Sequence, residues 1–327
     1  MIRMKSMAQR KKIEPIPAEQ SHLYGIKSPQ ALANRLGWPL DKLRGLANSG
    51  GYRVYNHKKT GREIQEPGAA LQSLHRQIHK YLSRIKTPDY LHSAVKGKSY
   101  LSNAKAHVGD VSLIKIDIAK FYQSVAQHKV MHFFRDVMDC APDVAGLLAN
   151  LICFRGVLPT GSSASPIISF YTYKFLFDDL AGLADAYGLT MTCYVDDITM
   201  SGELASRQIL QEARTMIFRA GLRAHKDRSF SPDGPKIVTG VAVTGRGIGL
   251  PFGRWQKIRN QVQELNRCTD DTEKLKIYQQ LISRLYEATQ IDPRARVSAE
   301  YHHARFRDLK RALAFAASEP APLALAA

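Results

Sequence analysis

The sequence is poor in cysteine, in long apolar runs and in acidic side chains. Its 327 residues include only four cysteines, and no two of them form a C-x-x-C pair. This pattern argues against a disulfide scaffold and a zinc site, and it favours a protein of the reduced cytoplasm. No apolar run approaches the roughly 20 residues that span a bilayer. The basic N-terminus MIRMKSMAQRKK lacks the apolar core of a secretory signal.

The shortage of acidic residues gives the chain a strong positive charge. There are 47 Lys and Arg residues against 29 Asp and Glu, for a net charge of +18 and a pI near 9.8. Such a balance favours a polyanionic partner through phosphate contacts and counterion release. An anionic membrane surface and a merely solvated basic face are the alternatives. Membrane binding requires a basic amphipathic segment with an exposed apolar face, which is not evident, so no membrane partner is expected and nucleic acid is favoured.

Apolar periodicity predicts a mixture of helices and hairpins. Strands and helices do not alternate strictly as βαβ units, which favours an α+β fold with an antiparallel sheet. The expected elements are short helices within 28–48, a hairpin over 52–67, a helix over 71–85, a strand over 111–118, a helix over 143–154, a hairpin centred on 196–197, a helix over 203–220, a hairpin over 236–251, and helices over 253–266 and 271–289.

One hairpin, CYVDDITMSG, carries two adjacent carboxylates. Apolar and polar residues alternate on both sides of Asp196 and Asp197, so the pair is expected at the tip where the strand reverses. One interpretation is that they are solvated turn residues, because Asp is common in two-residue loops. The other is that they hold a metal ion.

A third carboxylate, Asp117, lies near the end of the strand VSLIKIDI between two isoleucines. Lys115 and Lys120 could pair with it at the surface. If this strand instead lies beside the hairpin, three carboxylates converge, and they cannot all stay ionised without cations. Mg²⁺ suits such a site, because it prefers carboxylate and phosphate oxygens.

Four motifs, in family order over roughly 50–260, resemble those of reverse transcriptases. YVDD resembles their Y-x-D-D box, and DIAKFY resembles the segment that supplies their third carboxylate. LPTGSSASP resembles their L-P-x-G-x-x-x-S-P block, and REIQEP resembles their fingers motif R-x-I-x-x-P. Four motifs in this order are far more specific than any one of them.

Two smaller motifs resemble elements of retron-type bacterial reverse transcriptases. Asn103 and His107 match an N-A-x-x-H element, and Val238, Thr239 and Gly240 match a V-T-G element. Each has a structural alternative, since His107 could face the core and V-T-G is common at a strand turn. Their combination favours the retron type over other bacterial reverse transcriptases, and the resemblance implies that these residues contact RNA.

The resemblance implies a right-hand polymerase with fingers, a palm built on an antiparallel sheet with helices, and a helical thumb. The implied divisions are a flexible basic arm over 1–20, fingers over 21–110, a palm over 111–250 with part of the fingers inserted at about 125–165, an RNA-binding thumb over 251–315, and a disordered tail over 316–327.

The resemblance also implies the roles of the site residues. Asp117, Asp196 and Asp197 would be catalytic and, with the Ile118 carbonyl, would bind two Mg²⁺ ions, for which Mn²⁺ could substitute. The implied nucleotide-binding residues are Lys58, Lys59, Arg62, Tyr122, Thr160 and Gly161. Tyr122 would exclude a ribose 2′-hydroxyl, while Phe121 is expected in the core. Many relatives carry Gln where Thr160 stands, and Thr cannot reach as far.

Further RNA contacts are implied for Trp255, Lys257 and Arg259 at the start of the thumb. Relatives carry Lys-Thr where this chain has Arg228 and Ser229, and that lysine is proposed to protonate pyrophosphate. Arg cannot readily surrender a proton. Either Lys226 substitutes for it or Arg228 only stabilises charge, and both alternatives stay open.

By resemblance, the protein binds its own structured noncoding RNA and, from dNTPs, copies part of it into single-stranded DNA. Priming from a guanosine 2′-hydroxyl would leave a branched RNA–DNA product, and a separate effector protein would join it in anti-phage defence. The alternatives are another bacterial reverse transcriptase, of the group II intron or defence-associated kind, and a catalytically idle RNA-binding scaffold.

Overall fold

A computed structural model describes residues 14–58, 60–234 and 236–318. The chain divides into two compact units, the first formed by Met1–His107 with Val111–Pro232 and the second by Val108–Asp110 with Asp233–Ala327. Among the helices of the described residues, none combines the length and the apolar character needed to cross a membrane. The predicted α+β class with antiparallel sheets is confirmed, because every pairing between named strands is antiparallel.

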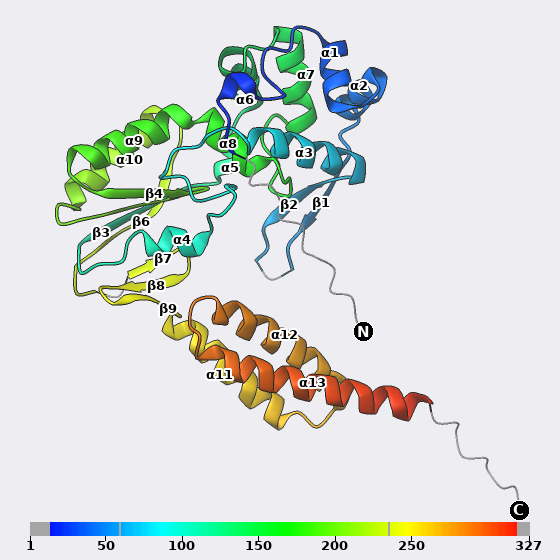
Figure 1. Cartoon of the computed structure of the whole chain (residues 1–327), viewed down its shortest axis with the longest axis vertical. Coiled ribbons are helices and arrows are strands. Elements are labelled where there is room, and N and C mark those ends of the chain that lie inside the picture. The colour runs from blue at the N-terminus through cyan, green and yellow to red at the C-terminus, as the bar shows by residue number, and fades with distance from the viewer. Residues whose placement is uncertain (1–13, 59, 235, 319–327) are drawn as a thin grey trace, which may run out of the picture. The chain divides into compact units, whose positions relative to one another are not determined.

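Among the described residues, six strands and most of the helices belong to the first unit. Figure 1 shows their arrangement in this unit. Its strands are β1 Tyr52–Asn56, β2 Glu63–Pro67, β3 Leu113–Ile118, β4 Thr190–Tyr194, β5 Asp197–Ser201 and β6 Ala224–Phe230. Its helices are η1 Ala18–Gln20, α1 Pro29–Leu36, α2 Leu40–Asn48, α3 Ala69–Leu82, α4 Tyr100–Lys105, α5 Phe121–Ser124, α6 Gln127–His132, the π-helical turn η2 Phe133–Val137, α7 Pro142–Ile152, α8 Ser165–Thr172, α9 Lys174–Ala186 and α10 Arg207–Arg219.

The larger sheet has the strand order β4-β5-β3-β6, and its two faces differ in chemistry. Side chains alternate between the faces of a strand, so Ile116 and Ile198, which are paired across β3 and β5, share one apolar face. They belong to the same buried cluster as Leu180 of α9 and Ile217 of α10. These two helices lie over the sheet in Figure 1. Burial of this face fixes which side chains point to the other face.

The opposite face of the sheet is polar, and a buried histidine spans one end of it. His107 follows α4, and its ring lies 2.7 Å from the Ser201 hydroxyl through Nδ1 and 2.7 Å from the Thr192 hydroxyl through Nε2. All three side chains are buried. Burial lowers the pKa of His107 to about 3, so the ring is neutral at physiological pH. His107 thereby joins β4 and β5 at the end away from their turn.

Strand β4 is covered along its outer edge. The backbone N–H of Cys193 donates to the Tyr90 carbonyl at 2.7 Å, and His92 N–H donates to the Cys193 carbonyl at 2.9 Å. The Ser93 hydroxyl accepts the N–H of Val195 at 3.0 Å. The segment 90–93 therefore satisfies backbone groups that an open sheet edge would expose.

The smaller sheet of the first unit is the hairpin β1–β2, followed by α3. The stripe predicted for this helix is confirmed, since its buried face includes Leu71, Leu74, Ile78 and Leu82. Just beyond α3, Ile85 forms a parallel bridge with Ile16. The predicted arm over 1–20 is therefore ordered over 14–20, and residues 1–13 lie outside the described residues.

Within 236–318, the second unit has a three-stranded sheet, β7-β8-β9, and three helices. Figure 1 shows these elements of the unit. Its elements are β7 Lys236–Val238, β8 Val241–Thr244, β9 Gly247–Gly249, α11 Phe252–Arg267, α12 Asp271–Thr289 and α13 Ala295–Ser318. Leu265 of α11 and Leu281 of α12 are buried, as is Ala299 of α13. Helix α13 extends into the tail predicted over 316–327, whose last nine residues, 319–327, lie outside the described residues.

Candidate functional site

The three aspartates predicted to converge lie together at one end of the larger sheet. Asp117 of β3 is the register partner of Asp197, the first residue of β5. Asp196 occupies the two-residue turn between β4 and β5, and its carbonyl accepts the N–H of Ile118 at 2.9 Å. The predicted hairpin is therefore confirmed, with Asp196 in its turn and Asp197 at the start of the returning strand.

The turn itself has an unusual backbone. Val195, its other residue, has a φ of +60°, a conformation that a β-branched residue adopts only at a cost. The Ser93 hydroxyl holds this residue by accepting its N–H. A strained turn that the surrounding structure maintains keeps Asp196 in a defined place beside β3.

Two basic side chains compensate the carboxylates. Lys115 Nζ lies 2.7 Å from Asp197 Oδ2, and both side chains are largely buried, at 20% and 15% exposure. His225 Nδ1 of β6 lies 3.0 Å from Asp117 Oδ1. Sequence reasoning considered Lys115 as a surface partner of Asp117, and the structure pairs it with Asp197 instead. His225 was missed, because only the register of β6 against β3 brings it to Asp117.

Burial and neighbouring carboxylates raise the pKa of Asp196 and of Asp197. Burial is the main cause that raises the pKa of Asp196 to about 6, followed by Asp117 and then by Asp197. Burial also raises the pKa of Asp197, which Lys115 opposes. The second oxygen of Asp197, Oδ1, is buried and accepts no hydrogen bond from the described residues. The site therefore has more negative charge and more acceptor capacity than its own cations satisfy.

A hard divalent cation fits this donor set, because clustered carboxylates and an unsatisfied buried carboxylate oxygen are what such an ion binds. The side chains have the chemistry that such an ion needs, but they are not already arranged around an ion. Within 14–58, 60–234 and 236–318, no three His, Cys, Asp or Glu side chains are already spaced as ligands of one ion. Lys115 and His225 hold two of the three carboxylates. Asp117, Asp196 and Asp197 would bind the ion once the contacts of Lys115 with Asp197 and of His225 with Asp117 are broken.

Tyr122 lies beside the carboxylates on the short helix α5. Burial raises the pKa of its hydroxyl, and the neighbouring Asp196 and Tyr194 raise it further. Phe121, the preceding residue, is 3% exposed, and its ring lies 6.1 Å from that of Phe177. The prediction that Phe121 belongs to the core is confirmed, and Tyr122 is the partly exposed aromatic next to the site.

The hairpin β1–β2 brings Arg62 near the same place. Arg62 immediately precedes β2, and its charge lowers the pKa of Asp196, opposing the burial of that carboxyl. Lys58 is exposed in the hairpin loop, and Lys59 lies outside the described residues. Thr160 and Gly161 lie against β2, where the Thr160 hydroxyl bonds to backbone groups of that strand.

The small motifs assigned to RNA are largely buried. Asn103 and His107 are 0% and 1% exposed, and Val238 is 0% exposed. Thr239 and Gly240 form the turn between β7 and β8, with φ values of +46° and +75°. The structural alternative therefore holds for His107, whose ring faces Ser201 and Thr192. At 1% exposure, and with both ring nitrogens bonded inside the protein, His107 offers RNA almost no surface.

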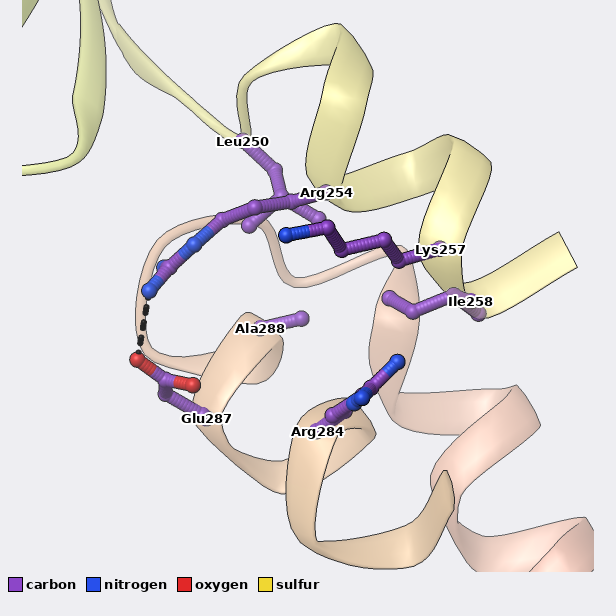
Figure 2. Close-up of a pocket in the computed structure, with 7 residues that line it drawn as sticks. All are labelled: Leu250, Arg254, Lys257, Ile258, Arg284, Glu287 and Ala288. Carbon is purple, nitrogen blue, oxygen red and sulfur yellow. Dashed lines mark hydrogen bonds and ion pairs between the residues drawn. The ribbon is translucent and has the colours of Figure 1, made fainter. Parts of the chain in front are cut away.

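The predicted contacts Trp255, Lys257 and Arg259 all lie on α11 in the second unit, and Lys257 and Arg259 are exposed. Figure 2 shows the residues that line a basic pocket between α11 and α12. The cavity volume of this pocket is about 200 Å³. Arg254 and Glu287 are paired there at 2.8 Å. The residues that line it are Leu250, Arg254, Lys257, Ile258, Arg284, Glu287 and Ala288. Three cations and one carboxylate give the pocket a net positive charge.

Lys226 and Arg228, the two residues that could serve the pyrophosphate leaving group, differ in their backbone surroundings. Lys226 is exposed with a φ of +53°, at an irregularity in the β3–β6 pairing, and Arg228 is the register partner of Lys115. A β-bulge of this kind re-aims the side chains next to it. Neither residue has an ion pair among the described residues, so the two alternatives stay open.

Known proteins resemble this chain over the region that builds the site. The family model "Reverse transcriptase (RNA-dependent DNA polymerase)" matches residues 44–228, more than half of the chain. The chain therefore belongs to the reverse transcriptase family, and the predicted polymerase fold is confirmed. The boundaries of fingers, palm and thumb stay predictions.

Curated relatives specify the type. The chain is 30% identical over 162 residues to the retron Se72 reverse transcriptase of Salmonella heidelberg, across 49% of this chain and 42% of that protein. It is 24% identical to the retron Ec86 reverse transcriptase of Escherichia coli, across 65% and 70%. It is 27% identical to the retron Mx162 reverse transcriptase of Myxococcus xanthus, across 72% and 57%. The resemblance to the retron type is confirmed, although the match spans less than half of the first relative.

The pair between Lys115 and Asp197 yields a stability prediction. Replacing Lys115 with Met should lower the free energy of unfolding by about 2 kcal/mol, because it leaves a largely buried carboxylate unpaired. Adding Asp197→Asn should recover most of that loss. Urea denaturation in the presence of a chelator measures both. Lys105→Met, which removes an exposed lysine of α4, is the matched control, and an equal effect of the two lysine variants would contradict the pair's importance.

Proposed function

We propose that this protein is an RNA-directed DNA polymerase of the retron type. The observation that carries the proposal is the convergence of Asp117, Asp196 and Asp197 at one end of the larger sheet, beside Tyr122 and near Arg62. A scaffold that only bound RNA would have no need of clustered carboxylates that destabilise one another by burial and mutual repulsion.

The reaction joins a primer hydroxyl oxygen to the α-phosphorus of a deoxynucleoside triphosphate and breaks the bond to pyrophosphate. Positioning and charge neutralisation supply most of the catalysis. When bound, two Mg²⁺ ions, or Mn²⁺ in their place, supply positive charge at the attacking and leaving oxygens. Asp117 and Asp196 would hold these ions, the Ile118 carbonyl would be a further ligand, and Asp197 would complete or support the cluster.

Side chains around the carboxylates bind the nucleotide. Arg62 contacts the triphosphate, since its planar fork matches phosphate oxygens, and Lys58 and Lys59 add positive charge from the same loop. Tyr122 presses against the sugar and excludes a 2′-hydroxyl by steric conflict. The exposed basic side chains of α11, Lys257 and Arg259, bind the phosphates of the RNA together with the pocket of Figure 2.

The retron-type part of the proposal rests on the relatives. The protein binds a structured noncoding RNA of its own and synthesises single-stranded DNA from it. Synthesis begins from a guanosine 2′-hydroxyl, which leaves RNA and DNA joined in a branch. A separate effector protein acts with this complex in anti-phage defence.

Removing the carboxylates tests the enzymatic proposal. The double variant Asp196→Asn/Asp197→Asn should lose about a thousandfold or more of its activity, because several kcal/mol of transition-state stabilisation depend on the cations that these groups hold. The measurement is extension of a primer on an RNA template with Mg²⁺ and dNTPs. Asp185→Asn, at an exposed acid of α9, is the control and should extend normally. Normal synthesis by the double variant would refute the site.

Tyr122 is tested by sugar selection. Tyr122→Ala should incorporate ribonucleotides more readily, with the preference for dNTPs falling by about tenfold or more, because the ring that meets the 2′-hydroxyl is gone. Tyr122→Phe keeps the ring and should keep the preference. Competing dNTP and rNTP incorporation in the same assay gives the ratio. An unchanged ratio in the alanine variant would remove this role from Tyr122.

The retron type is tested by the nucleic acid that co-purifies with the protein from its native host. We expect one RNA species joined to DNA through a 2′,5′ linkage, detected by sequencing before and after treatment with a debranching enzyme. Linear RNA of mixed sequence would count against the retron type while leaving the polymerase proposal standing.

A further inference from the structure

We infer that Thr160 is a positioning residue, which locks the hairpin β1–β2 to the loop 158–166 and so sets the position of Arg62. Sequence resemblance placed Thr160 at the nucleotide. Its contacts in the structure lead instead to the backbone of β2.

The hydroxyl of Thr160 has both a donor and an acceptor role on β2. It donates to the Glu63 carbonyl at 3.2 Å and accepts the N–H of Gln65 at 3.2 Å. These are alternate residues of one strand, so the hydroxyl bridges two backbone groups that face the same edge of the hairpin. A hydroxyl has one proton to donate, and in this arrangement that proton is directed at β2.

Backbone groups of the loop extend the same contact. Thr160 N–H donates to Gln65 Oε1 at 3.2 Å, and Gly161 N–H donates to the Gln65 carbonyl at 3.1 Å. Gln65 is 5% exposed, and its Nε2 donates to Glu63 Oε1 at 2.7 Å. The loop thus adds to the free edge of β2 almost as a third strand would, with Gln65 bonded to it through N–H, carbonyl and side chain.

Gly161 brings the two backbones too close for any side chain. A Cβ at this position would lie 2.7 Å from the Gln65 carbonyl oxygen and 3.0 Å from Glu66 Cα. Both are backbone atoms, which cannot swing away as the end of a flexible side chain can. Glycine is therefore required here by proximity, independently of the Thr160 hydroxyl.

The loop is anchored on its other side, so it can serve as a fixed support. His75 Nε2 faces the Leu151 carbonyl at 2.8 Å and must donate, because a carbonyl only accepts. Burial lowers the pKa of His75 to about 4, so the ring is neutral and its Nδ1 accepts the Ser162 hydroxyl proton at 2.7 Å. The Ser162 oxygen in turn accepts Ala164 N–H at 3.1 Å. The donor and the acceptor of each hydrogen bond in this series are therefore defined.

The consequence falls on Arg62, the residue before β2. A hairpin held at Glu63 and Gln65 cannot move away from the carboxylates without breaking these bonds. Thr160 then acts through Arg62, which binds the triphosphate of every incoming nucleotide alike. It does not act by contacting one part of the sugar. This consequence for catalysis rests on the proposed polymerase function, whereas the lock itself does not.

The first test is kinetic. Thr160→Val keeps the shape of the side chain but loses both hydroxyl bonds, and we expect KM for each of the four dNTPs to rise about tenfold with kcat changed less than about twofold. Thr160→Ser keeps the hydroxyl and should restore KM. A dideoxynucleotide should show the same factor as its dNTP. A change that differs between the two sugars would mean direct nucleotide contact and would overturn the inference, as would an unchanged KM.

The second test reads the lock directly and does not depend on activity. Hydrogen exchange of the peptide containing 63–67 should accelerate about tenfold in Thr160→Val and in Gly161→Ala, while peptides from β3 and β5 are unchanged. Gly182→Ala, at a glycine of α9 with open space around it, is the control and should leave exchange in 63–67 unaltered. Unchanged exchange in both loop variants would overturn the inference even if the wild-type protein polymerises DNA. Faster exchange in a chain that does not polymerise would leave the lock standing without its proposed consequence.

Discussion

The pairing of β3 with β5 determines where the chemistry of this protein lies. Asp117 stands opposite Asp197 only in the observed register, in which Ile116 also stands opposite Ile198. A slip of β3 by one residue would turn Ile116 toward the polar face and bring Asp117 to the apolar face that α9 and α10 cover. Because burial of the apolar face disfavours that slip strongly, the hydrophobic core holds the carboxylates together even though their mutual repulsion opposes it.

The remaining charges of that face follow from the same register. Lys115 lies two residues before Asp117 and therefore on the same side of β3, where it reaches Asp197. His225 reaches Asp117 from β6 on the other side. These partners lower the cost of burying carboxylates in the protein without cations, and they leave Asp196 without an ion pair among the described residues. The carboxyl with the most strongly raised pKa is thus the one in the turn.

Much of this arrangement was predictable from sequence, and the failures have identifiable causes. Strand β3, the hairpin at Asp196 and the helices α3 and α10 carry clear apolar periodicity, so local pattern sufficed. Strand β6 was not predicted, because Lys226, Asp227 and Arg228 give it no apolar alternation, and it exists through its pairing with β3. The partner of Lys115 could not be predicted for a related reason: the sequence offered Asp117 as a possible partner, whereas the register brings Lys115 to Asp197.

Family motifs identified the site but did not separate residues that touch substrate from residues that hold the fold. Both ring nitrogens of His107 are bonded to Ser201 and Thr192. The V-T-G turn has the positive φ values that let the chain reverse between β7 and β8. Thr160 bonds to β2 in the same way. In each case the polar atom or backbone angle that makes the motif recognisable is already used inside the protein. A short motif therefore marks a place where only certain side chains or backbone angles fit. Only the contacts in the structure decide whether a ligand or the neighbouring strand imposes that restriction.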